Sequence, residues 1–224
     1  LGKLANEADN DSGSFKKDAV RALVLYPMNA LVNDQLGRMR DLFGDERLKS
    51  EFLNLKSERI PTFARYTSRT PYAGKRESKK DKKKFEGYEK FYVKIESEMD
   101  NPDSPNREKR KALFRSLKNI GKWPAKPSIS DWYNGRSGNP RWGDQGDRLK
   151  KHELDSELLS RHEVQQNPPD VLITNFSMLS YMMLRPLENN IFSKTKSWLK
   201  NHPEEKFLIV FDEAHLYMGS QGAE

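Results

Sequence analysis

Three short apolar runs, spread along the chain, constrain its fold more than any other feature. They are Val20–Tyr26, Val171–Thr174 and Phe207–Phe211. Continuous apolar runs of this length are typical of strands that are buried on both faces of a parallel sheet. Apolar residues at helical spacing follow the first two runs, over 29–43 and 176–184. Strands that alternate with helices predict an α/β fold with a parallel sheet, in which we expect Phe207–Phe211 to be buried on both faces.

The composition excludes several classes of protein. The chain has 224 residues, of which 35% are hydrophobic and 33% charged, and it has no cysteine. Disulfides and cysteine-based zinc sites are therefore impossible. No apolar run approaches the roughly 18 residues that a membrane-spanning helix needs, and no signal-peptide pattern opens the chain. We expect a cytoplasmic protein of one or two domains with no membrane partner.

The positive charge is concentrated in the middle of the chain. Residues 75–122 hold 16 Lys and Arg against 9 Asp and Glu, so they account for the whole net charge of +7. Such a segment can serve a phosphate backbone, although a charge run is more often a solvated surface. We expect residues 71–164 to be a basic insertion between two parts of an α/β core, 1–70 and 165–224.

The expected insertion is mostly helical or irregular. Apolar residues at helical spacing predict helices over 85–99 and 107–120, whereas 123–147 is rich in Gly and Pro and predicts an irregular loop. The polar stretch 9–17 also predicts a loop. Trp and Tyr side chains of the insertion could stack on unpaired bases, or they could pack the insertion against the core.

The third apolar run ends in two carboxylates, within the sequence Asp212-Glu213-Ala214-His215. In open α/β sheets, ligands bind beyond the carboxyl ends of the strands. A pair of acids at that point suits a nucleotide with its magnesium ion. The alternative is that the acids merely begin a helix, because Asp and Glu are favoured at helix N-termini.

Three segments together resemble one family. Tyr26-Pro27-Met28-Asn29-Ala30-Leu31 is similar to motif Ia of superfamily 2 helicases, Ile173-Thr174-Asn175-Phe176-Ser177-Met178-Leu179 resembles the segment before motif II, and Asp212-Glu213-Ala214-His215 resembles the DEAH form of motif II. Their order is that of the first RecA-like domain of DEAH-box helicases. The residues of these segments are most similar to those of large bacterial helicases of the Lhr-like and MrfA-like kind. That group includes repair helicases and the helicases of phage-defence systems such as DISARM. The resemblance implies a RecA-like parallel sheet flanked by helices.

The resemblance also implies a nucleotide site that uses ATP and Mg²⁺. Asp212 would hold Mg²⁺, chiefly through water, because magnesium keeps much of its hydration. Glu213 would orient and activate the attacking water, so Asp212 and Glu213 are the candidate catalytic residues. Ala214 and His215 would complete the cofactor-binding set. Taken alone, His215 is better explained as a polar residue at a helix start.

A nucleic-acid partner, DNA in particular, is the second implication. The turn after the first strand and the following helix N-terminus would face a phosphate backbone. The candidate contacts are Pro27, Met28, Asn29, Ala30, Gln35, Arg38, Thr174 and Asn175. The alternative is structural: Asn29 and Asn175 would cap helices, and Arg38 would be a solvated helix residue.

The chain departs from the family pattern in one large respect. It contains no Gly-x-x-x-x-Gly-Lys-Ser/Thr phosphate loop, and it lacks the motifs of a second RecA-like domain. We therefore expect ATP hydrolysis of a full-length protein and none by this chain alone. Two other hypotheses stay open: a nucleic-acid-binding or protein-binding module without ATPase activity, and an insertion that binds proteins of a defence or repair complex.

Overall fold

The centre of the molecule is a five-stranded parallel sheet. The computed structural model describes residues 1–27, 29–71, 83, 85–135 and 151–214. Within them lie β1 (Ala22–Tyr26), β2 (Phe63–Arg65), β3 (Glu157–Leu158), β4 (Val171–Asn175) and β5 (Leu208–Phe211). The strand order is β3-β2-β4-β1-β5, and every pair is parallel. The predicted α/β class and the three predicted strands are confirmed.

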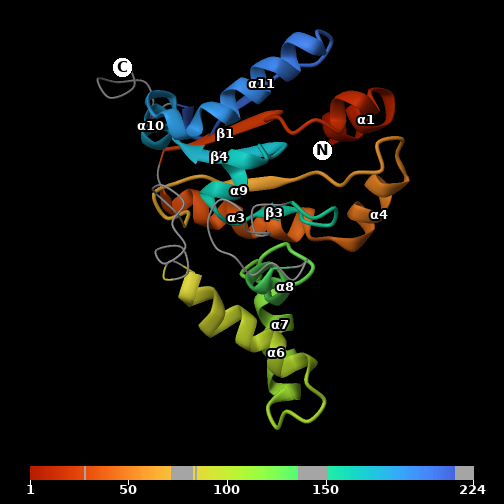
Figure 1. The fold of residues 1–224 in the computed structure, drawn as a ribbon, viewed down its shortest axis with the longest axis vertical. Helices are drawn as coiled ribbons and strands as arrows, with labels where there is room; N and C mark the ends of the chain where they lie inside the picture. The colour runs from red at the N-terminus through yellow and green to blue at the C-terminus, as the bar shows by residue number, and fades with distance from the viewer. Residues whose placement is uncertain (28, 72–82, 84, 136–150, 215–224) are drawn as a thin grey trace.

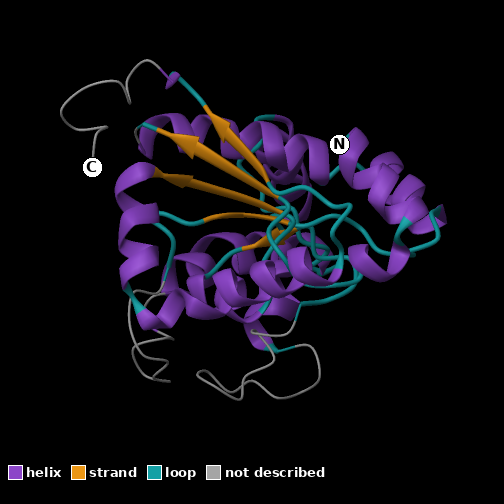
Figure 2. Cartoon of the chain, turned by 90° about the horizontal axis from the view of Figure 1, so that it is seen from above, coloured by secondary structure: helices purple, strands orange, loops and turns teal. Residues whose placement is uncertain are grey.

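Helices cover both faces of this sheet (Figures 1 and 2). On one face a hydrophobic cluster draws on α1 (Gly2–Asn10), α2 (Ser12–Phe15), α3 (Asn29–Phe43) and α4 (Glu46–Asn54). On the other face a second cluster draws on α9 (Arg161–Gln166), α10 (Phe176–Leu184) and α11 (Asn189–Asn201). Alternate residues of β4 serve the two clusters, Val171 and Ile173 in the first and Leu172 in the second. This two-sided burial explains why the strand sequence is continuously apolar.

The strand β5 corrects one expectation. Leu208, Ile209, Val210 and Phe211 are 42%, 50%, 47% and 52% exposed, so the strand is not buried on both faces. The physical reason is its place in the sheet: β5 is an edge strand that pairs only with β1 among the described residues. Sequence periodicity reports how apolar a strand is, but not which position it takes in the sheet.

Residues 85–134 of the expected insertion form helices with a hydrophobic cluster of their own. A helical hairpin projects from the α/β part (Figure 1), formed by a π-helical turn η1 (Glu89–Val93) with α6 (Lys94–Asp100) and by α7 (Arg107–Asn119). Phe85, Ile95, Trp123 and Trp132 are among the buried residues of this cluster. The two tryptophans are 6% and 1% exposed, so the structure contradicts stacking on bases for them. They pack inside this cluster and not, as the alternative supposed, against the α/β core.

One further helix lies where an irregular loop was expected. Helix α8 (Ile129–Asn134) begins after Ser128, whose side chain accepts a hydrogen bond from the Asp131 amide. The carboxylate of Glu96, on α6, accepts hydrogen bonds from the amides of Ile129 and Ser130 at 2.8 and 2.6 Å. These two partners satisfy the free N–H groups of the helix start. The second comes from a residue more than 30 positions away, which local sequence cannot indicate.

Buried ion pairs join this helical segment to the core. The Lys126 ammonium lies 3.0 Å from carboxylate oxygens of both Asp155 and Glu163. Burial lowers the pKa of Lys126, but the two carboxylates outweigh it and hold the pKa above its ordinary value. The strand β3 immediately follows Asp155 and pairs with β2, so the sheet takes a strand from within 71–164.

Two short helices were also missed by the sequence analysis. Helix α2 occupies 12–15 within the expected loop and is capped by Asp11. Helix α9 follows Ser160, which forms a capping box with Glu163. Helices of four and six residues are too short to show a helical period, so only their capping residues could have indicated them.

A second buried ionic network holds the amino end of the sheet. The Asp170 carboxylate, which is fully buried, accepts hydrogen bonds from Arg21 at 2.8 Å and from Arg59 at 2.9 and 3.0 Å. It also accepts from the amide and hydroxyl of Thr62 at 2.7 and 2.9 Å. Glu7 on α1 pairs with the other side of Arg21 at 2.8 Å. The network therefore ties α1, β1, β2 and β4 together.

Candidate functional site at the carboxyl edge of the sheet

The three family-like segments meet at one edge of the sheet. In the parallel register, Tyr26 on β1 stands opposite Asn175 on β4, and Leu25 stands opposite Phe211 on β5. The Asp212 amide extends this ladder by donating a hydrogen bond to the Leu25 carbonyl at 3.0 Å. The end of β1 is thus flanked by Asp212 on one side and by Asn175 on the other.

The two candidate catalytic carboxylates lie on the turn that follows β5. Asp212 is half-buried and Glu213 is exposed. Glu213 has a φ of 53°, in the left-handed region that non-glycine residues seldom adopt. Unusual backbone of this kind is concentrated at functional sites. Ala214 follows in a short helical turn and is exposed, whereas His215 lies outside the described residues.

The side chain of Tyr26 is influenced both by Asp212 and by charged residues of α3. Burial raises the pKa of its phenol, and the negative charge of Asp212 raises it further. Arg38 on α3 lowers this pKa, while Asp34 raises it. Charges from the turn after β5 and from α3 therefore act on the same side chain.

The turn after β1 leads directly into α3. Asn29 is the first residue of this helix and not the residue before it, which differs from the expected cap. Met28 lies outside the described residues, as do the side chains of Asn29 and Ala30, while Pro27 is half-buried.

Farther along α3, the two remaining candidates differ in exposure. Gln35 is half-buried. The Arg38 side chain is 74% exposed, and its guanidinium lies 3.8 Å from the Asp34 carboxylate on the same helix. An exposed pair of this kind is weak, so Arg38 has the accessibility that a contact with a backbone phosphate requires.

Thr174 and Asn175 have partners inside the protein. The Thr174 hydroxyl is fully buried and donates a hydrogen bond to the Tyr66 carbonyl at 2.6 Å. Thr174 therefore joins β4 to β2 and does not face the surface, contrary to its expected place. The Asn175 side chain accepts from the Met178 amide at 2.8 Å and caps α10, as its structural alternative supposed.

Arg65 is a residue of this edge that the sequence analysis missed. It ends β2, and its guanidinium donates a hydrogen bond to the side-chain oxygen of Asn33 on α3 at 2.6 Å. Burial lowers the pKa of Arg65. Nearby, Arg161 donates to the Thr67 carbonyl at 2.8 Å and lies over the Tyr66 ring. A single arginine at the end of a three-residue strand carries no periodic signal. The position of these residues at the edge is therefore evident only from the three-dimensional structure.

The chain is therefore an α/β protein with a parallel sheet. At the carboxyl edge of this sheet lie a pair of carboxylates, Asp212 and Glu213, and the N-terminus of α3. No described helix is long and apolar enough to span a membrane. No family model matches the chain, and no solved structure matches it significantly.

Among curated proteins, the chain is similar to the Druantia protein DruE of Escherichia coli (strain UMEA 4076-1). The two sequences are 41% identical over 238 aligned positions, which cover 100% of this chain and 12% of DruE. The chain is therefore homologous to a segment of DruE, and it spans about 12% of the length of that relative.

Proposed function

We propose that this chain is part of a DruE-like phage-defence protein, in which it forms part of the first RecA-like domain of an ATP-dependent DNA helicase or translocase. The observation that carries the proposal is the register at the end of β1, with Asn175 on one side and Asp212 on the other. Homology to DruE supports the defence context. The resemblance to DEAH-box helicases is the basis for proposing ATP-dependent helicase or translocase activity.

The carboxylates have the chemistry that Mg²⁺-ATP requires. Asp212 and Glu213 are adjacent at the carboxyl edge, and neither is buried, which suits a cation that keeps most of its water ligands. Bound Mg²⁺ would neutralise charge on the phosphates. Asp212 would hold the hydrated ion, and Glu213 would orient the attacking water and accept its proton. The left-handed backbone at Glu213 sets the direction of this side chain.

The nucleic-acid contact is assigned to the start of α3. Helix N-termini carry free N–H groups and a partial positive charge, which suits phosphate. Arg38 adds an exposed cation about two and a half turns farther on. Asn175 ends the neighbouring strand β4 at the same edge and is 8% exposed, whereas Thr174 is fully buried and is left out of the contact.

The exposed apolar strand β5 is explained by the same proposal. Four consecutive apolar residues that are each more than 40% exposed would be costly on a free surface. An edge strand that, among the described residues, pairs with a single neighbour favours pairing with another strand. We assign this edge to contact with the remainder of a DruE-like protein, including the phosphate loop that this chain lacks.

The test is Glu213→Gln in the full-length protein. Loss of the water-activating carboxylate is expected to lower DNA-stimulated ATP hydrolysis by at least about a hundredfold, because general-base catalysis contributes on the order of 10²–10⁴. ATP affinity should stay within a few-fold, since the phosphate loop and base contacts supply most of the binding. The matched control is Glu58→Gln, because Glu58 is an exposed glutamate with a φ of 51° that lies far from this edge in sequence.

Two outcomes would overturn the proposal. The first is ATP turnover by Glu213→Gln at the wild-type rate. The second is a full-length wild-type protein that neither hydrolyses ATP nor binds DNA, which would favour a protein-binding module.

A further inference from the structure

The net charge of the chain is concentrated on one helix of the insertion. Residues 107–122, which are α7 and the segment after it, hold seven basic side chains and one acidic one. The basic stretch 75–106 is nearly balanced, with nine against eight. The excess charge of a 224-residue protein thus resides almost entirely on α7 and its C-terminal extension.

Four of these cations form a stripe along α7. Arg107, Lys111, Arg115 and Lys118 stand at positions i, i+4, i+8 and i+11, which share one face of a helix. We call these four residues the α7 stripe. Leu113 and Leu117 occupy a different face and pack against the core of the insertion. Phe114 packs there too, and it lies at the border of the two faces, four residues before Lys118. Arg115 and Lys118 are exposed, and Arg107 and Lys111 are half-buried.

Acidic side chains neutralise little of the stripe. Among the described residues, Glu108 is its acidic partner, at 3.1 Å from Lys111. The pKa of Glu108 lies below its ordinary value, first because of Lys111 and then because of Arg107 and Arg115, so these three cations act on the same side of the helix. The nearby Glu98 is occupied by Arg110, off the stripe. Within the described residues, Arg115 and Lys118 have no carboxylate within 4.0 Å.

The C-terminal end of α7 is fixed to α3. Gly121 has a φ of 62°, and a Cβ added to it would lie 2.5 Å from the Cα of Gly37 on α3, so the two backbones touch. Arg40 on α3 donates hydrogen bonds to the carbonyls of Gly121 and Lys122 at 3.4 and 3.2 Å. The Tyr92 hydroxyl donates to the Lys122 carbonyl at 3.0 Å. The stripe is therefore held in a fixed relation to the helix that begins at the carboxyl edge of β1.

We propose that the α7 stripe is a second binding surface for a nucleic-acid phosphate backbone, separate from the carboxyl edge. This inference rests on the proposed function, and it adds a site to it. From Arg107 to Lys118 the stripe spans about 16 Å at the rise of an α-helix. Measured along the axis of a duplex, that length corresponds to about five base-pair steps. The contact is independent of sequence, because cations on phosphates position a nucleic acid and do not read its bases.

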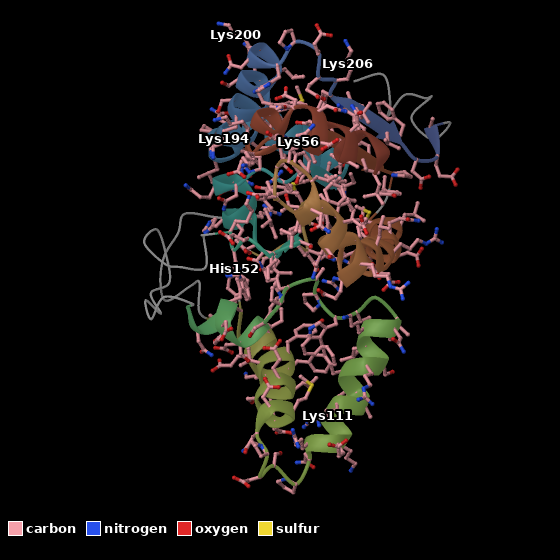
Figure 3. All side chains as sticks on the ribbon, turned by 90° about the vertical axis from the view of Figure 1, so that its right-hand side faces the viewer. Lys56, Lys111, His152, Lys194, Lys200 and Lys206 are labelled. Atoms are coloured by element: carbon pink, nitrogen blue, oxygen red, sulfur yellow. The ribbon has the colours of Figure 1, made fainter. Side chains whose placement is uncertain are left out.

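The test compares two charge-matched variants of the full-length protein. The first replaces the stripe by glutamine: Arg107→Gln, Lys111→Gln, Arg115→Gln and Lys118→Gln. The second removes the same charge from exposed lysines of the core: Lys56→Gln, Lys196→Gln, Lys200→Gln and Lys206→Gln. Figure 3 shows Lys111 on the hairpin, while Lys56, Lys200 and Lys206 lie on the α/β part. Affinities for labelled duplex and single-stranded DNA are measured over a salt series.

The stripe variant is expected to bind DNA at least about tenfold more weakly at low salt, with a log–log salt slope shallower by about two to four. The core variant should stay within about twofold of wild type at every salt concentration, as expected for charges outside the contact. A greater loss for duplex than for single strands, or the reverse, identifies which form lies on the stripe. ATP turnover without DNA should be unchanged in both variants.

Equal affinity and an equal salt slope for wild type and the stripe variant would overturn the inference, as would equal losses in the two variants. DNA-stimulated turnover of the stripe variant at the wild-type level, with its affinity also unchanged, would leave the proposed function intact and assign the stripe to an acidic protein partner. Absence of DNA binding by the wild type would instead overturn the proposed function itself.

Discussion

Arg40 on α3 and Glu157 on β3 form a bidentate ion pair, with Nε–Oε2 and Nη2–Oε1 distances that are both 2.8 Å. Glu157 also accepts a hydrogen bond from the Ala125 amide at 2.9 Å. Burial lowers the pKa of Arg40, and the charge of Glu157 more than offsets this effect. One carboxylate thus connects α3, the edge of the sheet and the segment that leaves the hairpin.

We expect Glu157→Gln to destabilise this junction by about 3 kcal/mol, because it leaves a largely buried guanidinium without its counter-charge. Hydrogen exchange should show faster opening of the amides of β3 and of 121–126, with the amides of β5 unaffected. A double substitution, Arg40→Met with Glu157→Leu, should recover part of the loss, since neither charge is then left unpaired. Equal exchange in wild type and Glu157→Gln would show that the pair contributes nothing.

The contact between Gly37 and Gly121 predicts an asymmetry between two similar substitutions. Gly121→Ala should destabilise the protein by about 2 kcal/mol or more, since the new Cβ would meet backbone and the residue has a positive φ. Gly37→Ala should be neutral or stabilising by up to about 1 kcal/mol, because alanine is a better helix former. The Cβ at Gly37 would find its nearest neighbour at 3.7 Å, an ordinary contact. Thermal unfolding of both variants tests the difference, and similar losses would contradict it.

Asp170 predicts a loss of stability in acid. Burial raises its pKa, but Arg59 and Arg21 outweigh burial, so that the folded-state pKa lies below the ordinary value of 3.8. A depressed carboxyl pKa stabilises the fold above the unfolded-state pKa, and this contribution falls away as the pH drops below about 4. Asp170→Asn should cost about 3–5 kcal/mol at neutral pH and should reduce the dependence of stability on pH between 5 and 3.

The control for this acid effect is Asp103→Asn, since Asp103 is exposed in the turn between α6 and α7. Urea unfolding at several pH values provides the measurement. An Asp103→Asn profile that changes as much as that of Asp170→Asn would mean that the buried network is not the source of the acid sensitivity.

Asn175 allows its two assigned roles to be separated. Asn175→Ala should lower stability by about 1 kcal/mol through loss of the cap on α10. Asn175→Asp should keep the cap, because aspartate is an equally good N-cap residue. If the end of β4 also faces a phosphate backbone, the negative charge of the new aspartate will weaken DNA binding several-fold. Unchanged DNA affinity of the folded Asp variant would reduce Asn175 to a structural residue.

The elements that sequence predicted well are those with strong local patterns. Helix α10 begins and ends where its apolar run does, at Phe176 and Leu184, and β1, β4 and β5 lie within the predicted runs or one residue beyond. The convergence of Asp212 with the end of β1 followed from the rule that parallel strands end at one edge.

What sequence could not supply depends on residues far apart in the chain. The exposure of β5 follows from its edge position, and the burial of Thr174 accompanies its hydrogen bond to Tyr66, the residue after β2. Strand β3 has only two residues and exists because β2 lies beside it. The sequence showed a charge excess over 75–122, but the α7 stripe became clear only with the packing of the hairpin, which turns Leu113 and Leu117 away from it.

The touching backbones of Gly37 and Gly121 have a mechanical consequence. With no side chain between them, a tilt of α3 acts directly on the backbone after α7 and cannot be absorbed by rotamer changes at that point. A rotation of the hairpin about Gly121 would move its far end at 101–106 farther than α3 itself. Any rearrangement at the carboxyl edge of the sheet that shifts α3 would thereby be amplified at the tip of the insertion.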